Sequence, residues 1–176
     1  MPEIAGLDHF TLVCRDLDES IRFYTEVMGA TIERPKRIST SVGSPAGFSP
    51  VGIMIGSLRI DLFQADEDWQ PYPGTLAQHY AFPIKWEDLD AWFAHMKNHN
   101  VQLSIHPAGD RTISLYFSDP TGYHMELNVR SNQPEVVQRE VERLLDTYGN
   151  PYFWADGPSI PAGQPAGRWA SPARVG

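Results

Sequence analysis

Three residues with metal-binding side chains, His9, His79 and Glu126, lie in segments whose composition is typical of β-strands. Apolar and polar residues alternate through these segments, 7–14, 78–84 and 123–129. Alternation sends successive side chains to opposite faces of a strand. A glutamate in mid-strand between two large apolar residues needs a partner, and a metal ion is one of the few that suits it. The segment alone also allows an exposed face with a solvated carboxylate.

The segment around Glu126 predicts a β-hairpin. Two alternating runs, Thr112–Phe117 and Tyr123–Val129, flank a turn that contains Asp-Pro-x-Gly. One face of this hairpin is apolar and is expected in the core: Leu115, Phe117, Met125 and Leu127. The other face is expected to carry the polar groups: Ser114, Tyr116, His124, Glu126 and Asn128. The hairpin thus gathers hydroxyl, imidazole and amide groups beside one carboxylate.

A pattern of one strand, one helix and three strands occurs twice in the chain. The tripeptide Asp-Leu-Asp opens both expected helices, at 16–18 and again at 88–90. His9 and His79 stand in matching strands. In the first unit the pattern predicts a helix with a stripe of Leu17, Ile21, Tyr24 and Met28, then strands 30–40, 50–55 and 58–63. In the second it predicts strand 78–84, a helix with Leu89, Phe93 and Met96 inward, and strands 101–105, 112–117 and 123–129. We therefore expect modules at 5–65 and 76–131 of a domain 1–132, then helix 134–148 and an irregular tail within 133–176.

Strand parity places four potential ligands, His9, Asp61, His79 and Glu126, on the faces opposite the helices. Two modules placed edge to edge would line a shared concave surface with these faces. Two imidazoles and one carboxylate are the ligand set of a divalent transition metal with open coordination positions. Zinc is also possible, with Asp61 or water completing its shell.

The bulk composition excludes several classes of protein. The net charge of -8 over 176 residues, without a Lys/Arg cluster, argues against nucleic-acid binding. No apolar run approaches the ~20 residues of a membrane span, and the N-terminus lacks a signal-peptide pattern. Cys14, the single cysteine, falls on the apolar face of its strand, so we expect core packing and a cytoplasmic location.

The motifs "LDHFTLV…DLDESIRFYTEVMGA", "HYAF" and "LYFSDPTGYHMEL" span residues 7–129 and resemble the vicinal oxygen chelate superfamily. This superfamily includes glyoxalase I, extradiol ring-cleaving dioxygenases and fosfomycin-resistance proteins. The resemblance implies an α+β fold in which two βαβββ modules form a half-open mixed β-barrel around one divalent metal, often in a homodimer or higher homo-oligomer. It implies His9, His79 and Glu126 as the ligands. Asp61 stands where glyoxalases place a further carboxylate, one methylene longer.

The same segment resembles the signature of extradiol dioxygenases, and we expect an Fe(II) enzyme that cleaves a catechol-like small molecule with O₂; Mn, Ni or Zn also suit these ligands. In that family a tyrosine at the position of Tyr116 hydrogen-bonds substrate or oxygen. His106 or His124 is expected to move protons. His106 stands one residue further from Tyr116 than the family pattern, and a loop histidine is the alternative. Four other residues are expected to contact substrate: Thr11, Asp61, Ser114 and Asn128.

Three alternatives stay open. Fosfomycin-type thiol transferases using Zn, Ni or Mn share "HYAF", "SLYFSDP-x-G" and Thr11, although His106 replaces a lysine that contacts their phosphonate. The net charge and the lack of an evident arginine cluster argue against an anionic phosphonate. A glyoxalase-like lyase or isomerase is favoured if Asp61 binds metal. A non-catalytic drug-binding resistance protein has no use for His9, His79 and Glu126 together.

Overall fold

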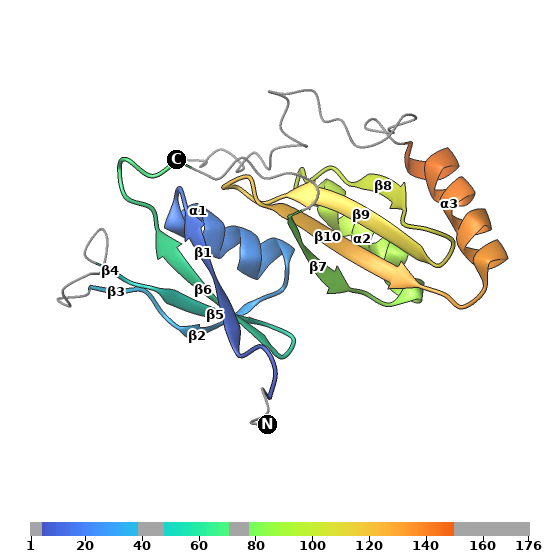
Figure 1. Cartoon of the computed structure of the whole chain (residues 1–176). Helices are drawn as coiled ribbons and strands as arrows, with labels where there is room; N and C mark the ends of the chain where they lie inside the picture. The colour runs from blue at the N-terminus through green and yellow to red at the C-terminus, as the bar shows by residue number, and fades with distance from the viewer. Residues whose placement is uncertain (1–4, 39–47, 71–77, 150–176) are drawn as a thin grey trace. The chain divides into compact units, whose positions relative to one another are not determined.

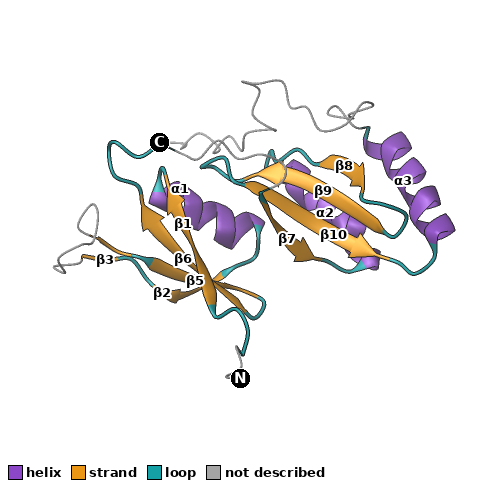
Figure 2. Cartoon of the chain, viewed as in Figure 1, coloured by secondary structure: helices purple, strands orange, loops and turns teal. Residues whose placement is uncertain are grey.

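The computed structural model describes residues 5–38, 48–70 and 78–149, which fall into two compact units, Met1–Gln70 and Pro71–Gly176. Each unit is described by itself (Figure 1). Both contain one main four-stranded mixed sheet and at least one helix. Figure 2 colours the helices purple and the strands orange.

The sheet of the first unit has the order β1-β6-β5-β2. Its strands are β1 (His9–Cys14), β2 (Thr31–Arg34), β5 (Val51–Ile55) and β6 (Leu58–Gln64). β1 runs parallel to β6, and the other neighbours are antiparallel. Two short strands, β3 (Arg37–Ile38) and β4 (Phe48–Ser49), form a separate pair.

The sheet of the second unit has the order β7-β10-β9-β8. Its strands are β7 (His79–Pro83), β8 (Ser104–Pro107), β9 (Thr112–Ser118) and β10 (His124–Arg130). β7 runs parallel to β10, and the hairpins β9–β10 and β8–β9 are antiparallel. Chain order and sheet order therefore match the first unit strand for strand, which confirms the predicted α+β class with two βαβββ modules.

The β9–β10 hairpin forms where its sequence predicted it. The Asp119 carboxylate accepts hydrogen bonds from the backbone N–H groups of Gly122 and Tyr123, both at 2.8 Å, and Gly122 takes a positive φ of 105° that suits glycine. This turn sets a register in which Glu126 faces Tyr116 and Asn128 faces Ser114. The predicted apolar face is confirmed, since its four side chains are almost fully buried: Leu115, Phe117, Met125 and Leu127.

The first helix differs from its predicted stripe. α1 (Leu17–Arg22) passes directly into a π-helix, η1 (Phe23–Val27). Because a π turn inserts an extra residue per turn, the buried face moves along the sequence: Phe23 and Val27 are buried with Tyr24, whereas Ile21 is only half-buried. The helix start is as its acidic residues suggest, because the Asp16 carboxylate accepts from the Glu19 N–H at 2.9 Å.

In its described part, the second unit has two helices besides the short η3 (Trp86–Asp88). α2 (Leu89–Asn98) buries the predicted stripe of Leu89, Phe93 and Met96. α3 (Pro134–Tyr148) has the predicted bounds, buries three apolar side chains and contacts β8 and β9. The stacked rings of Phe93 and Tyr148, with centroids 4.1 Å apart, join α2 to α3.

Several strand boundaries differ from the sequence prediction. The predicted strand 30–40 divides into β2 and β3 around Pro35, which has no N–H for a ladder. The predicted strand 101–105 begins later, at Ser104, so that His106 lies within β8 and not in a loop. The tail after Gly149 lies outside the described residues. No helix in the described ranges is long and apolar enough to cross a membrane.

Candidate metal and substrate site

The centre of the second module's polar face is the Glu126 carboxylate, whose side chain is 6% exposed. Its Oε1 accepts hydrogen bonds from the Ser114 hydroxyl at 2.7 Å and from the Asn128 amide at 3.2 Å. Both donors lie on the face where strand parity predicted them, Ser114 on β9 and Asn128 beside Glu126 on β10. These two bonds fix one carboxylate oxygen and orient the other.

His79 supplies the second potential ligand. Its Nε2 lies 2.8 Å from Oε2 of Glu126. In sheet register His79 on β7 pairs with His124 on β10, two residues before Glu126. The module thus brings an imidazole nitrogen and a carboxylate oxygen to one point, with the remaining carboxylate oxygen already hydrogen-bonded.

Tyr116 lies beside this pair. Its ring centroid is 5.4 Å from that of His79, with the rings almost perpendicular. Burial and the nearby Glu126 carboxylate raise the pKa of Tyr116, so the hydroxyl keeps its proton at neutral pH. A protonated phenol at this position can donate a hydrogen bond to an oxygen of a bound molecule.

The two histidines proposed for proton transfer occupy different surroundings. His106 is exposed on β8, opposite Ser114 in register, with its ring centroid 6.1 Å from that of Tyr116. His124 is buried on β10 on the same strand face as Glu126. Both histidines therefore lie in the same module as Tyr116. Their proposed roles in proton transfer stay predictions.

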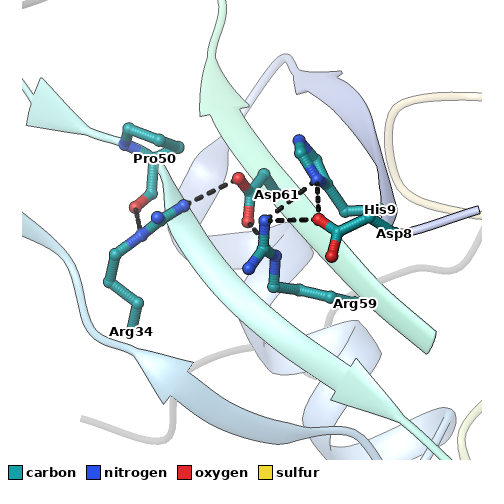
Figure 3. Close-up of polar contacts among 6 residues, drawn as sticks. All are labelled: Asp8, His9, Arg34, Pro50, Arg59 and Asp61. Carbon is teal, nitrogen blue, oxygen red and sulfur yellow. Dashed lines mark hydrogen bonds and ion pairs between the residues drawn. The ribbon is translucent and has the colours of Figure 1, made fainter. Parts of the chain in front are cut away.

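In the first module, His9 lies on β1 and its Nδ1 is 2.6 Å from Oδ2 of Asp8. Nη2 of Arg59 donates to the same Asp8 oxygen at 3.1 Å and lies 2.9 Å from Nδ1 (Figure 3). Nδ1 of His9 thus has two partners: with a proton it donates to Asp8, and without one it accepts from Arg59, which can only donate. Hydrogen bonding to His9 and the charge of Arg59 lower the pKa of Asp8. In the tautomer with the proton on Nδ1, Nε2 of His9 carries the lone pair that a metal ligand requires.

The Asp61 carboxylate is buried between two arginines. Nη2 of Arg34 lies 2.8 Å from its Oδ2, and Nε of Arg59 lies 3.7 Å from its Oδ1 (Figure 3). Arg34 comes from β2 and crosses over Gly52 of β5, where a Cβ would approach the Cβ of Arg34 to 3.2 Å. Asp61 is thus neutralised by arginines in this unit. Thr11, its register neighbour on β1, is exposed.

Sequence reasoning missed these two arginines and judged the chain to lack an arginine cluster. Arg59 was detectable, because it stands two residues before Asp61 on one strand and therefore shares its face. Arg34 was not, because only the lateral order β2-β5-β6 brings it to Asp61.

The donor chemistry of the His79–Glu126 pair fits a divalent transition metal. One imidazole and one carboxylate converge, and hydrogen bonds from Ser114 and Asn128 supply the outer support that ligating carboxylates usually have. In the part of the chain that the structure describes, no group of three or more His, Cys, Asp or Glu side chains meets at one point. The third predicted ligand, His9, belongs to the other compact unit, so the three-ligand site stays a prediction.

The family model of the Glyoxalase/Bleomycin resistance protein/Dioxygenase superfamily matches residues 6–127, both modules together. The chain belongs to this superfamily. The predicted vicinal-oxygen-chelate membership is thereby confirmed.

Characterised relatives share about a quarter to a third of their residues with the chain. Metallothiol transferase FosB of Bacillus licheniformis is 30% identical over 134 residues, covering 73% of this chain and 78% of that protein. Glutathione transferase FosA of Serratia marcescens is 27% identical over 128 residues, covering 73% and 83%. Glyoxalase domain-containing protein RDO1 of Mycosarcoma maydis is 26% identical over 133 residues, covering 71% and 68%.

Solved structures share the fold at lower identity. The fosfomycin resistance protein FosX from Listeria monocytogenes superposes with a TM-score of 0.58 at 22% identity, covering 77% of this chain and 99% of that one. Another FosX structure, with a TM-score of 0.57 at 23% identity and covering 76% and 98%, holds Mn(II) and 1S,2S-dihydroxypropylphosphonic acid.

These relatives correct the predicted activity. The expectation of an Fe(II) extradiol dioxygenase is wrong, because the FosA and FosB relatives, matched over most of the chain, are transferases. Iron as the cofactor and O₂ as a substrate were predicted from that activity, so neither is supported any longer. Tyr116 and the Asp-Pro-x-Gly segment misled the prediction. This segment resembles both the extradiol dioxygenases and the fosfomycin-resistance proteins, so it does not distinguish the two.

Proposed function

We propose that this chain is a divalent-metal-dependent transferase that adds a thiol to fosfomycin or to a closely related small phosphonate. The activity is taken from the FosA and FosB relatives. The single structural observation that supports it is the Glu126 carboxylate, buried, held on one oxygen by Ser114 and Asn128, and meeting His79 Nε2 with the other.

His79 and Glu126, together with His9, would hold the metal. All three side chains suit Mn, Ni or Zn, and a bound divalent ion supplies a Lewis acid that polarises a substrate oxygen. Ser114 and Asn128 keep the Glu126 carboxylate in one orientation, and Asp8 does the same for the His9 ring. Tyr116 donates a hydrogen bond to a substrate oxygen.

The reaction balances without an oxidant or reductant. Fosfomycin is a small epoxide that carries a phosphonate. The thiol sulfur forms a bond to an epoxide carbon, the bond from that carbon to the ring oxygen breaks, and the thiol proton ends on that oxygen. The product is a thioether with a neighbouring hydroxyl.

The experiment incubates the full chain with Mn²⁺, Ni²⁺ or Zn²⁺, fosfomycin and a thiol, either glutathione or cysteine. Loss of free thiol and a new ³¹P resonance report the adduct. We expect turnover with at least one metal and none after chelation. Glu126→Gln should lower kcat/KM by at least about 100-fold, since it removes a charged ligand.

The matched control is Glu87→Gln, a change of the same chemistry at an exposed position of the same unit, which should leave turnover unchanged. Metal-dependent adduct formation that persists in Glu126→Gln would contradict the assignment of the site. No adduct from fosfomycin with any metal and thiol would overturn the proposed reaction.

A further inference from the structure

Arg34 and Arg59 converge on one face of the first sheet from two sides of Asp61 (Figure 3). The Asp61 side chain is 9% exposed, whereas Arg34 and Arg59 are 43% and 32% exposed. A buried carboxylate that holds two half-exposed guanidinium groups fixes the direction of both.

Each guanidinium keeps donors in reserve. Within the described residues, Arg34 donates through Nε to the Pro50 carbonyl at 3.2 Å and meets Asp61 through Nη2. Arg59 donates through Nη2 to Asp8, and its 3.7 Å contact with Asp61 is beyond hydrogen-bonding distance. The Nη1 group of each forms no hydrogen bond or ion pair among the described residues. Oriented guanidinium groups with spare N–H donors are what carboxylate and phosphate groups bind.

The arginine pair lies next to His9. Arg59 and His9 are partners in the parallel register of β1 and β6, and Arg59 Nη2 is 2.9 Å from the His9 ring. If one end of a small molecule were held near His9, its other end would therefore lie within reach of these guanidinium groups. This follows from contacts within the first module alone.

We propose that Arg34 and Arg59 form a clamp for an oxyanion, a phosphonate or a carboxylate of the substrate. This inference deepens the proposed function and rests on it for the identity of the reaction, but the clamp itself is a property of the first module. It explains how an acidic chain accepts an anionic substrate: the positive charge is local, and Asp61 orients it.

The test measures anion binding by the metal-free full chain, in low salt with a chelator, by ¹H–¹⁵N NMR. The probes are methylphosphonate and acetate, which separate the two oxyanion types. We expect resonances of the Arg34 and Arg59 side chains and of Gly52 to shift with one of them. Arg34→Gln and Arg59→Gln should each weaken binding by about 10-fold or more, the effect of one charge-assisted hydrogen bond.

Two further variants make the result decisive. Arg37→Gln, at an exposed arginine of the same unit, should bind like wild type. Arg34→Lys keeps the charge without the fork and replaces Arg34→Gln if that variant does not fold; it should also weaken binding.

His79→Ala separates the clamp from the proposed reaction, because it should abolish turnover and leave anion binding intact. The clamp is refuted if neither probe shifts these resonances, or if Arg34→Gln and Arg59→Gln bind as wild type does. Anion binding without thiol transfer would keep the clamp and remove the proposed function.

Discussion

The two modules each place a carboxylate at the equivalent position of their own sheet and surround it differently. Asp61 and Glu126 both lie on the strand that pairs in parallel with the histidine-bearing strand. Asp61 meets two arginines, whereas Glu126 meets a histidine, a serine and an asparagine. One carboxylate of the repeat thus pairs with cations of the chain itself, and in our proposal the other binds a metal ion.

The residue opposite each carboxylate explains part of the difference. Gly52 faces Asp61 in register, and Tyr116 faces Glu126. The missing side chain at Gly52 lets Arg34 cross β5 to reach Asp61. Tyr116 instead places a ring and a hydroxyl beside Glu126. The duplicated scaffold therefore surrounds one carboxylate with arginines and the other with an imidazole, a hydroxyl and an amide.

His9 and His79 should contribute equally to metal binding, whereas Asp61 and Glu126 should not. Replacing His9 or His79 by Ala should each weaken metal binding by more than about 100-fold, because a direct ligand matters more than its supporting groups. Isothermal titration with Mn²⁺ or Zn²⁺ measures the loss. A His9→Ala variant with wild-type affinity would confine the metal to the second module.

The carboxylates should differ in what they stabilise. Asp61→Asn in the metal-free chain should lower the free energy of unfolding by about 1–3 kcal/mol, since it leaves Arg34 and Arg59 without their shared anion. Glu126→Gln should cost less than about 1 kcal/mol, because the amide oxygen still accepts from Ser114 and Asn128. Urea unfolding compares the two, and equal losses would show that the carboxylates serve one purpose.

The hydrogen bonds that Ser114 and Asn128 donate to Glu126 should raise the affinity for the metal. Ser114→Ala removes the 2.7 Å hydrogen bond to Oε1 and should weaken metal binding by about 10-fold. Asn128→Ala removes the longer bond of 3.2 Å and should have a smaller effect. The reverse order would indicate that Asn128 holds the carboxylate.

The smallest effect concerns α3, the helix that follows the second module. Tyr148 donates to Asp90 at 2.6 Å, and this bond, followed by Arg143, lowers the pKa of Asp90. A carboxylate with a lowered pKa stabilises the fold above about pH 4 and loses that contribution as the pH falls through its folded value. Tyr148→Phe should cost at most about 1 kcal/mol at pH 7, because the pair is exposed, and less at pH 3. A cost that grows on acidification would contradict this role of Asp90.

Much of this architecture followed from local sequence patterns. Alternation identified β9 and β10 and the face of Glu126, because the two-residue period of a strand is visible in the sequence itself. The repeated Asp-Leu-Asp revealed the duplication. The order of the strands within each sheet could not be predicted from the sequence. The contact of Arg34 with Asp61 depends on that order and on Gly52. The π turn after Arg22 also has no periodic signal.

The activity was harder to predict than the site. The ligand-type residues and Tyr116 are common to several chemistries of the superfamily, so their identity does not select one. The pair of Arg34 and Arg59, which we propose binds an anionic group of the substrate, could not be recognised from the sequence.

Metal stoichiometry and affinity in three proteins test the divergence of the modules most directly: wild type, Asp61→Asn and Glu126→Gln, each titrated with Mn²⁺ or Zn²⁺. The divergence of the modules predicts one ion per chain for wild type and for Asp61→Asn, with similar affinity, and loss of binding in Glu126→Gln. Retention of the ion by Glu126→Gln together with its loss from Asp61→Asn would contradict it.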